Sequence, residues 1–251
     1  MRKGILSLAM IRLWGFVFSG AGTDPLKSEQ GRAEARDAYI QLAIGYLQEG
    51  QPSRAKAPIS EALKLDSRNA QAHMVLALIF QQEMEYDLAD EEFRKAISLS
   101  SDSRIQNNYG SFLFERERYA EAQKYFELAS QDTLYPERAR VFQNLGLVAL
   151  KLQQPQQAEA FFTRALRLDG TQTLALLHLA KLNYERQEIV PASQYFQAYT
   201  QLAQPTAEGL LLGAQLAEAV GDRSNAASLV LQLKRLYPAS AEYQQWLTEH
   251  P

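Results

Sequence analysis

The sequence predicts an all-α protein, an α-solenoid superhelix of six two-helix repeats followed by a C-terminal capping helix. Three observations support this prediction. Small residues recur every 33 to 36 positions, apolar residues accompany each of them at helical spacing, and strong helix formers such as Ala, Leu, Gln and Glu dominate the composition. Of the 251 residues 46% are hydrophobic and 22% are charged, which is enough apolar material for a buried core.

The composition also excludes several classes of function. The chain has no cysteine, so it has no disulfide, no cysteine-based zinc site and no thiol nucleophile. Its three histidines are far apart and begin no metal-ligand spacing, and a net charge of −3 gives no basic face for nucleic acid. The sequence shows no Ser/His/Asp set, acid dyad or phosphate loop. We therefore expect a protein that is not an enzyme, with no catalytic residue, no cofactor and no metal.

The first 21 residues have the features of a secretory signal. Residues 1–3 are basic at two positions, residues 5–18 are mostly apolar, and the small residues Ser19 and Ala21 suit cleavage after Ala21. The apolar stretch is too short for a transmembrane helix and is interrupted by Arg12. The alternative is an untranslocated, disordered N-terminus. Residues 22–35 are expected to be a linker.

Each repeat is marked by a small residue that opens its second helix. This residue recurs at intervals of 34, 33, 36, 34 and 34: Ala55, Ala89, Ala122, Ala158, Ala192 and Ala226. Another small residue lies twelve positions before each: Ala43, Ala77, Gly110, Gly146, Ala180 and Ala214. This is the tetratricopeptide pattern, a helix–turn–helix of about 34 residues. It predicts six repeats over residues 36–238, starting near residues 36, 70, 103, 139, 173 and 207.

The spacing has a physical basis in close helix packing. Two facing small residues let the paired helices approach each other, and the apolar residue four positions later fills the space on the same face.

The interval of 36 places a longer connection at residues 131–136. Residues 239–251 are expected to form the capping helix, with Ser240 as N-cap and with Tyr243, Trp246 and Leu247 on one face.

The first helices of such an array line its inner surface. In the first unit the core positions are expected at Tyr39, Leu42, Ala43 and Tyr46. The inward positions of the first two units are mostly apolar, which predicts a partner-binding groove for an amphipathic helix or an extended apolar peptide: Ile40, Ile44, Leu47, Met74 and Leu78. The alternative is that the linker or a shifted register buries these residues.

A second, semi-apolar inner wall is expected further along the array. It comprises Leu147, Leu150, Leu174, Leu177 and Tyr184. The amides of Asn107, Asn108 and Asn144 are candidates for bonding an extended peptide backbone, or for satisfying neighbouring helix termini.

Several segments resemble the PilF/PilW family of type IV pilus biogenesis proteins, the pilotins of the pilus secretin. They are residues 34–42, 88–96, 107–110, 129–138 and 233–238, and the resemblance covers roughly residues 25–248. It implies six tetratricopeptide repeats, no enzymatic activity and a periplasmic lipoprotein attached to the outer membrane. Such a protein helps the secretin subunit to reach the outer membrane and multimerise, so that pili form and twitching motility follows.

One departure from the family concerns lipidation. Family members carry a lipobox that ends in Cys, and here Ala21 stands in that place. Alanine has no sulfur to accept a diacylglyceryl group, so no lipidation is expected on this chain. The expectation is a monomeric periplasmic protein that contacts the outer membrane only if lipidated. Its expected partner is the secretin subunit, bound through an apolar or amphipathic segment, and not nucleic acid.

Two other functions compete with this one. A general tetratricopeptide scaffold or co-chaperone would bind segments of other clients, but it needs a basic, Asn-rich clamp for a terminal carboxylate. The apolar inner positions and the acidic Asp37 argue against such a clamp. A regulatory partner of a cell-wall enzyme is the third hypothesis, and no residue in the sequence distinguishes it.

Overall fold

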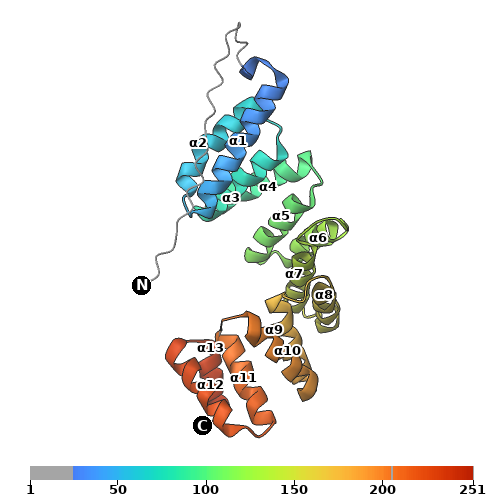
Figure 1. Cartoon of the computed structure of the whole chain (residues 1–251), viewed down its shortest axis with the longest axis vertical. Helices are drawn as coiled ribbons and strands as arrows, with labels where there is room; N and C mark the ends of the chain where they lie inside the picture. Colours follow the sequence, from blue (N-terminus) through green and yellow to red (C-terminus); the bar gives the residue numbers. More distant parts are fainter. Residues whose placement is uncertain (1–24, 205, 251) are drawn as a thin grey trace, which may run out of the picture. The chain divides into compact units, whose positions relative to one another are not determined.

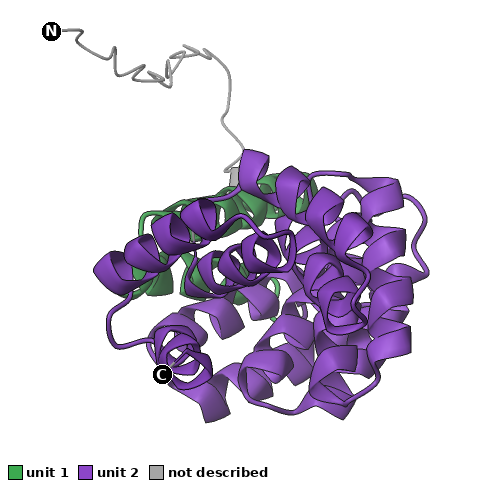
Figure 2. Cartoon of the chain, turned by 90° about the horizontal axis from the view of Figure 1, so that it is seen from below, with its two compact units in different colours: residues 1–67 green, residues 68–251 purple. Residues whose placement is uncertain are grey.

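The computed structural model describes residues 25–204 and 206–250 of the chain. These residues form thirteen α-helices, one short 3-10 helix and no strand (Figure 1). The chain divides into two compact units, unit 1 at residues 1–67 and unit 2 at residues 68–251 (Figure 2). None of the helices in the described ranges has the length and apolar character needed to span a bilayer.

The described part of unit 1, residues 25–67, is a single helical hairpin. It contains the 3-10 helix η1 (Pro25–Lys27), α1 (Glu29–Gln48) and α2 (Pro52–Leu65). The Ser28 hydroxyl accepts a 2.9 Å bond from the Gly31 amide and fixes the start of α1. Helix α1 therefore begins seven residues earlier than the predicted first repeat, and the predicted linker at 22–35 is helical from Glu29 onward. The predicted signal segment, with Ala21, lies outside the described residues.

Unit 2 contains eleven of the described helices, which form five consecutive hairpins and one final helix. They are α3 (Ala70–Gln82), α4 (Tyr86–Leu99), α5 (Ser103–Glu115), α6 (Tyr119–Ser130), α7 (Arg138–Lys151), α8 (Pro155–Leu168), α9 (Thr173–Glu185), α10 (Ile189–Leu202), α11 (Ala207–Ala219), α12 (Arg223–Leu236) and α13 (Ala241–Glu249). The first helix of each hairpin starts within one residue of a predicted repeat start.

The two helices of each hairpin are in close contact with each other. The six alanines that mark the second helices are all buried. A Cβ atom added at Gly110 would lie 2.8 Å from the ring of Phe126, and one added at Gly146 would collide with the ring of Phe162. The rings of Phe126 and Phe162 thus occupy the space that a larger residue would need, as the repeat pattern predicts.

The turn inside each hairpin has one backbone conformation throughout. The residue two positions beyond each first helix has a positive φ, and these residues are Gly50, Met84, Glu117, Gln153, Gln187 and Gly221. The next amide bonds back to a carbonyl five residues earlier, as in the 2.9 Å bond from Arg118 N to Leu113 O. This is a Schellman motif, which usually contains glycine because other residues are strained there. Four of the six turns adopt it without glycine.

The connection between α6 and α7 is the longest within unit 2, and it is fixed to α5. Asp132 accepts a 3.0 Å bond from the Ser103 hydroxyl, and the buried Tyr135 hydroxyl lies 3.4 Å from the Asn107 side-chain amide. Arg138 donates a 2.8 Å bond to the carbonyl of Ser130 across the base of the loop. These bonds hold the insertion that the interval of 36 indicated.

The final helix α13 covers the end of the last hairpin. The Ser240 hydroxyl accepts a 3.2 Å bond from the Tyr243 amide, as expected of its N-cap. Trp246 is buried in a cluster with Leu211, Ala214 and Leu233. Tyr243 packs against the same cluster, whereas Leu247 is 45% exposed.

The core assignment in α1 also needs correction. Tyr39 and Leu42 were expected in the core but are 37% and 48% exposed, while Ala43 is fully buried. In later repeats the equivalents of Leu42, such as Tyr109 and Leu145, are buried on helices that contact the second helix of the preceding hairpin. The described residues contain no such helix before α1, so this side of α1 has no covering layer.

Candidate functional site

The predicted partner-binding groove is not an exposed surface. Ile40 is 1% exposed, Met74 is 4% exposed and Leu47 is also buried, whereas Ile44 and Leu78 are half-buried. Ile40, Leu47 and Met74 therefore contribute to the core, and a partner has no access to their side chains in this conformation.

The reason for this correction is visible within unit 2. Met74 is the fifth residue of its repeat, and the Nδ2 atom of Asn108 on the next first helix lies 3.6 Å from its sulfur. Consecutive first helices of unit 2 contact each other, so the fifth position faces a neighbouring helix and not solvent. Only the second, ninth and twelfth positions remain accessible on the face that the first helices form.

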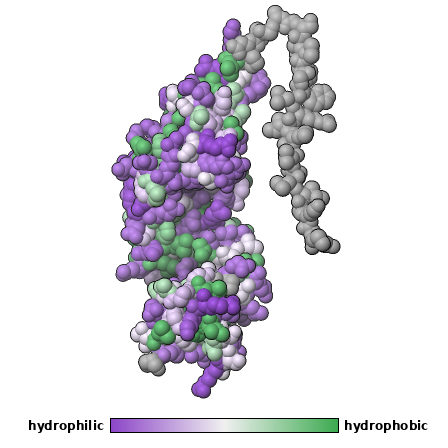
Figure 3. Space-filling view, turned by 90° about the vertical axis from the view of Figure 1, so that its left-hand side faces the viewer, coloured by the Kyte–Doolittle hydropathy of each residue, from purple (hydrophilic) through white to green (hydrophobic). Residues whose placement is uncertain are grey.

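We call this face the first-helix face of unit 2, formed by α3, α5, α7, α9 and α11. The predicted second wall lies partly on it. Leu147, Leu150 and Tyr184 are half-buried and Leu174 is 40% exposed, but Leu177 is 2% exposed and belongs to the core. Leu177 occupies the fifth position of its repeat, as Met74 does. In Figure 3 apolar side chains gather in patches on the side of the chain that is shown, with hydrophilic ones around them.

A small pocket opens on the first-helix face between α5 and α7. It has a volume of about 180 Å³ and is lined by Ser111, Phe114, Glu115, Phe126, Asn144 and Leu147. Its wall is mostly apolar, with the Phe114 ring held edge-on against Tyr119 at a centroid distance of 5.4 Å. The pocket is large enough for one inserted apolar side chain and offers polar groups at its rim.

The asparagines near this pocket are used mainly inside the protein. Asn107 is buried and bonds Tyr135, Asn108 donates a 2.8 Å bond to the Arg104 carbonyl, and Asn144 lies 3.4 Å from the Asn107 side-chain oxygen. Of the three, Asn144 alone also lines the pocket. Asn107 thus bonds a tyrosine hydroxyl and Asn108 bonds a carbonyl of its own helix, so neither bond is to the terminus of a neighbouring helix.

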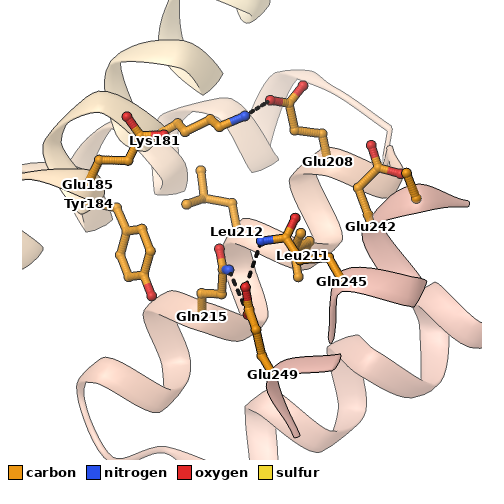
Figure 4. A pocket seen from close by; sticks show the side chains of 11 residues that line it. Lys181, Tyr184, Glu185, Glu208, Leu211, Leu212, Gln215, Glu242, Gln245 and Glu249 are labelled. Atoms are coloured by element: carbon orange, nitrogen blue, oxygen red, sulfur yellow. Dashed lines mark hydrogen bonds and ion pairs between the residues drawn. The ribbon is translucent and has the colours of Figure 1, made fainter. Parts of the chain in front are cut away.

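A larger cleft lies between α9, α11 and α13 (Figure 4). It has a volume of about 440 Å³, and its lining side chains are Lys181, Tyr184, Glu185, Glu208, Leu211, Leu212, Gln215, Ala241, Glu242, Gln245 and Glu249. Leu211 and Leu212 are buried and form an apolar floor. Helix α13 supplies one wall, so this cleft depends on the capping helix as well as on the repeats.

Hydrogen bonds fix two of the carboxylates that line the cleft (Figure 4). Lys181 Nζ lies 2.8 Å from Glu208, which joins α9 to α11. Glu249 accepts bonds from Gln215 at 3.5 Å and from Gln245 at 2.8 Å, which joins α11 to α13. Burial raises the pKa of Glu208, but the bond from Lys181 and the charges of His178 and Lys181 together outweigh it, and the pKa is lowered overall.

The cleft is electrically negative. It is lined by four glutamates and a single lysine. Burial raises the pKa of the Tyr184 phenol, and the nearby carboxylates of Glu249 and Glu218 raise it further. In the described part of the chain, neither Glu185 nor Glu242 has a hydrogen-bond or ion-pair partner.

Sequence reasoning found Tyr184 but missed the other residues of this cleft. Glu242, Gln245 and Glu249 follow one another on α13 at helical spacing, which was a usable signal. The α9 and α11 residues that line the cleft with them are 27 or more positions away along the chain, and only the fold brings them together. No group of three or more potential metal ligands occurs within residues 25–204 and 206–250.

Comparisons with known proteins support the repeat assignment. Two tetratricopeptide-repeat family models match the chain, one at residues 40–104 and the other at residues 101–171. The chain is 50% identical over 250 residues to the type IV pilus assembly protein PilF of Pseudomonas aeruginosa, with 99% of each chain covered.

Two solved structures extend this similarity to three dimensions. The structure of Pseudomonas aeruginosa PilF matches with a TM-score of 0.84 and 53% identity, covering 87% of this chain and 99% of the other. The structure of PilW, described as a widely conserved type IV pilus biogenesis factor, matches with a TM-score of 0.72 and 34% identity. That match covers 84% of this chain and 98% of PilW.

Proposed function

The chain belongs to the PilF/PilW family of tetratricopeptide-repeat proteins of type IV pilus biogenesis, and on this premise we propose that it is a non-catalytic periplasmic pilotin. In this role it binds the secretin subunit of the pilus and promotes its outer-membrane localisation and multimerisation. Pilus assembly and twitching motility depend on that step.

The observation that carries the binding role is the pocket between α5 and α7. Its apolar wall at Phe114 and Leu147 can bury a side chain of a bound segment, while Asn144 and Ser111 offer polar groups beside it. Fully burying one large apolar side chain contributes about 1.5–3 kcal/mol, enough for one such anchor to dominate a weak interface. We therefore place the docking of an apolar or amphipathic secretin segment here, and not at the buried Ile40 and Met74.

One half-buried residue of the predicted groove, Leu78, and one of the predicted second wall, Leu147, fit this placement. Leu78 on α3 and Leu147 on α7 occupy the ninth position of their repeats, and Ser111 occupies it on the intervening helix α5. An extended segment that runs along the ninth positions would first contact Leu78, then the pocket beside Ser111, and then Leu147. This arrangement favours an apolar partner at the N-terminal end of the first-helix face.

The experiment blocks the pocket without disturbing the core. The change Ser111→Arg places a large side chain at the pocket, and the hydroxyl that it removes bonds only the Asn107 carbonyl within the same helix. The secretin subunit is co-expressed with wild-type or variant chain, and its multimers are measured in the outer-membrane fraction. We expect the wild-type chain to produce multimers, and the variant to bind the subunit at least tenfold more weakly and to leave most of it unassembled.

The matched control is Ser98→Arg on α4. Ser98 is exposed and its hydroxyl bonds the Lys95 carbonyl in the same way, but it does not line the pocket. Normal multimer formation with Ser111→Arg would show that the docking surface lies elsewhere. Unchanged secretin assembly in the complete absence of the chain would refute the pilotin role itself.

The competing function is a general scaffold that binds apolar segments of other clients. The same pocket can serve it, because the first-helix face of a repeat array suits any extended peptide of matching chemistry. Covalent cross-linking of the exported chain in cells, followed by identification of the captured protein, separates the two functions: the pilotin role requires the secretin subunit among the captured proteins.

A further inference from the structure

We propose that the cleft between α9, α11 and α13 is a second docking site, and that it takes a basic, amphipathic peptide segment of a partner protein. The anchor is an arginine or lysine side chain, with its aliphatic part on the floor of the cleft and its charged end among the carboxylates. This site is separate from the pocket between α5 and α7 and differs from it in charge. This inference depends on the proposed function in one respect only, which is that the partner is a protein.

The first step of the argument is the shape of the cleft and the chemistry of its floor. A volume of about 440 Å³ exceeds the space that a single side chain needs, so the cleft has room for several residues of a bound segment. Leu212 and Tyr184 face this space together with Leu211 (Figure 4). The aliphatic part of an arginine or lysine side chain packs well on such a surface while its charged end stays near water.

The second step is the charge of the walls. The lining contains four glutamates, Glu185, Glu208, Glu242 and Glu249, against the single ammonium of Lys181. Glu208 is neutralised by its bond to Lys181. Glu249 is held by two glutamine amides, which leave its charge uncompensated. Since Glu185 and Glu242 have no partner within the described ranges, three uncompensated carboxylates surround an apolar floor.

The third step selects the occupant. An acidic peptide would place like charges opposite one another, and a purely apolar segment would leave three carboxylates desolvated without a partner. A basic amphipathic segment satisfies both the carboxylates and the leucines. The anchoring of Glu249 by Gln215 and Gln245 also positions its carboxylate before binding, which lowers the ordering cost of recognition.

Binding of defined probe peptides tests this proposal. Three fluorescent peptides of equal length alternate leucine with lysine, glutamine or glutamate, and their affinities for the full chain are measured by fluorescence anisotropy. We expect the lysine probe to bind most tightly and the glutamate probe to bind least. The affinity of the lysine probe should fall as salt rises from low to high concentration, because screening weakens contacts between exposed charges.

The decisive variant is the double change Glu185→Gln and Glu242→Gln, which removes two unpaired charges while preserving side-chain size. Contacts between exposed charges are individually weak, so we expect the loss of two of them to make the lysine probe bind about fivefold more weakly. The matched control is Glu85→Gln with Glu127→Gln, two exposed carboxylates on other surfaces, which should leave its affinity unchanged.

A fluorophore locates the binding event. Because the chain has no cysteine, the change Ala241→Cys gives a single attachment point at the rim of the cleft and leaves the bonds to Glu249 in place. We expect the lysine probe to change the emission of a dye there and not that of a dye attached through Ser98→Cys. Equal affinity for the lysine and glutamate probes, an unaltered affinity in the cleft variant, or an equal loss in the control variant would overturn the proposal. No secretin subunit takes part in this assay, so its failure is distinguishable from failure of the pilotin role.

Discussion

The Tyr109 hydroxyl of α5 donates a 2.7 Å hydrogen bond to the Asp90 carboxylate of α4. The same carboxylate accepts a 3.0 Å bond from Arg118, which precedes α6, and pairs with Arg94 one turn along α4 at 2.9 Å. Tyr109 is buried among the rings of Phe93, Phe112 and Tyr125. One phenol thus joins two consecutive repeats through both its apolar ring and its polar end.

The change Tyr109→Phe should destabilise the protein by about 1–2 kcal/mol, because the Asp90 carboxylate loses one of its hydrogen bonds while the ring packing is kept. Urea unfolding followed by circular dichroism measures the difference. Tyr195→Phe on α10 is the control, since that half-buried phenol bonds nothing within the described residues. An equal effect of the two changes would mean that the Asp90 bond adds nothing to stability.

The same pair predicts a loss of stability at alkaline pH. Burial and then the Asp90 carboxylate raise the pKa of Tyr109 from its ordinary value of 10.0 to about 12. A pKa that is higher in the folded than in the unfolded state stabilises the fold fully below pH 10, and this contribution disappears as pH rises through 12. The stability difference between wild type and Tyr109→Phe should therefore shrink over that range. Unfolding measured between neutral pH and pH 12 tests this, and a constant difference would contradict it.

An acid-sensitive group lies on the other side of α4. Glu92 is buried and lies 2.6 Å from His73 Nδ1 and 2.7 Å from Lys95 Nζ. Burial raises the pKa of Glu92, but the bonds from His73 and Lys95 outweigh it and hold the pKa below 4.5 overall. A pKa lowered by folding stabilises the protein above the unfolded value and ceases to do so as pH falls through the folded value.

The change Glu92→Gln should consequently destabilise the protein at neutral pH, and this cost should decrease as the pH falls below about 4.5. Thermal unfolding of both proteins at several pH values measures the trend. Glu91→Gln is the control, because Glu91 pairs with the same Lys95 but is exposed. A cost for Glu92→Gln that grows toward acid pH would have the wrong sign for this explanation.

Close packing between paired helices predicts a steric effect at Gly146. The change Gly146→Ala places a methyl group against the fully buried ring of Phe162 and should cost about 1–3 kcal/mol. Gly45→Ala introduces the same methyl group inside helix α1, where no atom lies within 4 Å, and it should stabilise the protein by about 1 kcal/mol or less. The free energies of unfolding of the two variants are compared in urea. Their difference separates the steric cost at Phe162 from the stability that any Gly→Ala change adds within a helix.

The N-terminal sequence predicts a change of localisation. If residues 1–21 are a cleaved signal, the mature chain starts at Gly22 and is free in the periplasm. The change Ala21→Cys introduces a cysteine that can accept a lipid, and we expect it to move the chain to the membrane fraction, since each buried methylene of an acyl chain contributes about 0.8 kcal/mol. Fractionation and N-terminal sequencing provide the measurement, and an intact Met1 on active protein would contradict export.

Part of the candidate site could be predicted from sequence and part could not. Tyr184 was found because it is apolar and occupies an accessible position of its repeat. The cleft around it was missed because Glu208 and Glu249 reach it from two other helices, and nothing local marks their side chains as neighbours. Met74 and Leu177 were wrongly predicted to be exposed, because the repeat position alone does not show that the next first helix lies against it.

The sequence by itself determined the repeats, their spacing and the alanine and glycine contacts inside each hairpin, because helix pairing follows from periodic small residues that are close in the chain. Only the tertiary structure decided which side of each first helix is covered. Tyr39 and Ile40 are adjacent and both mainly apolar, yet the first is exposed and the second is buried. Burial depends on what packs against each side of a helix, and that is set by layers far apart in sequence and by where the array ends.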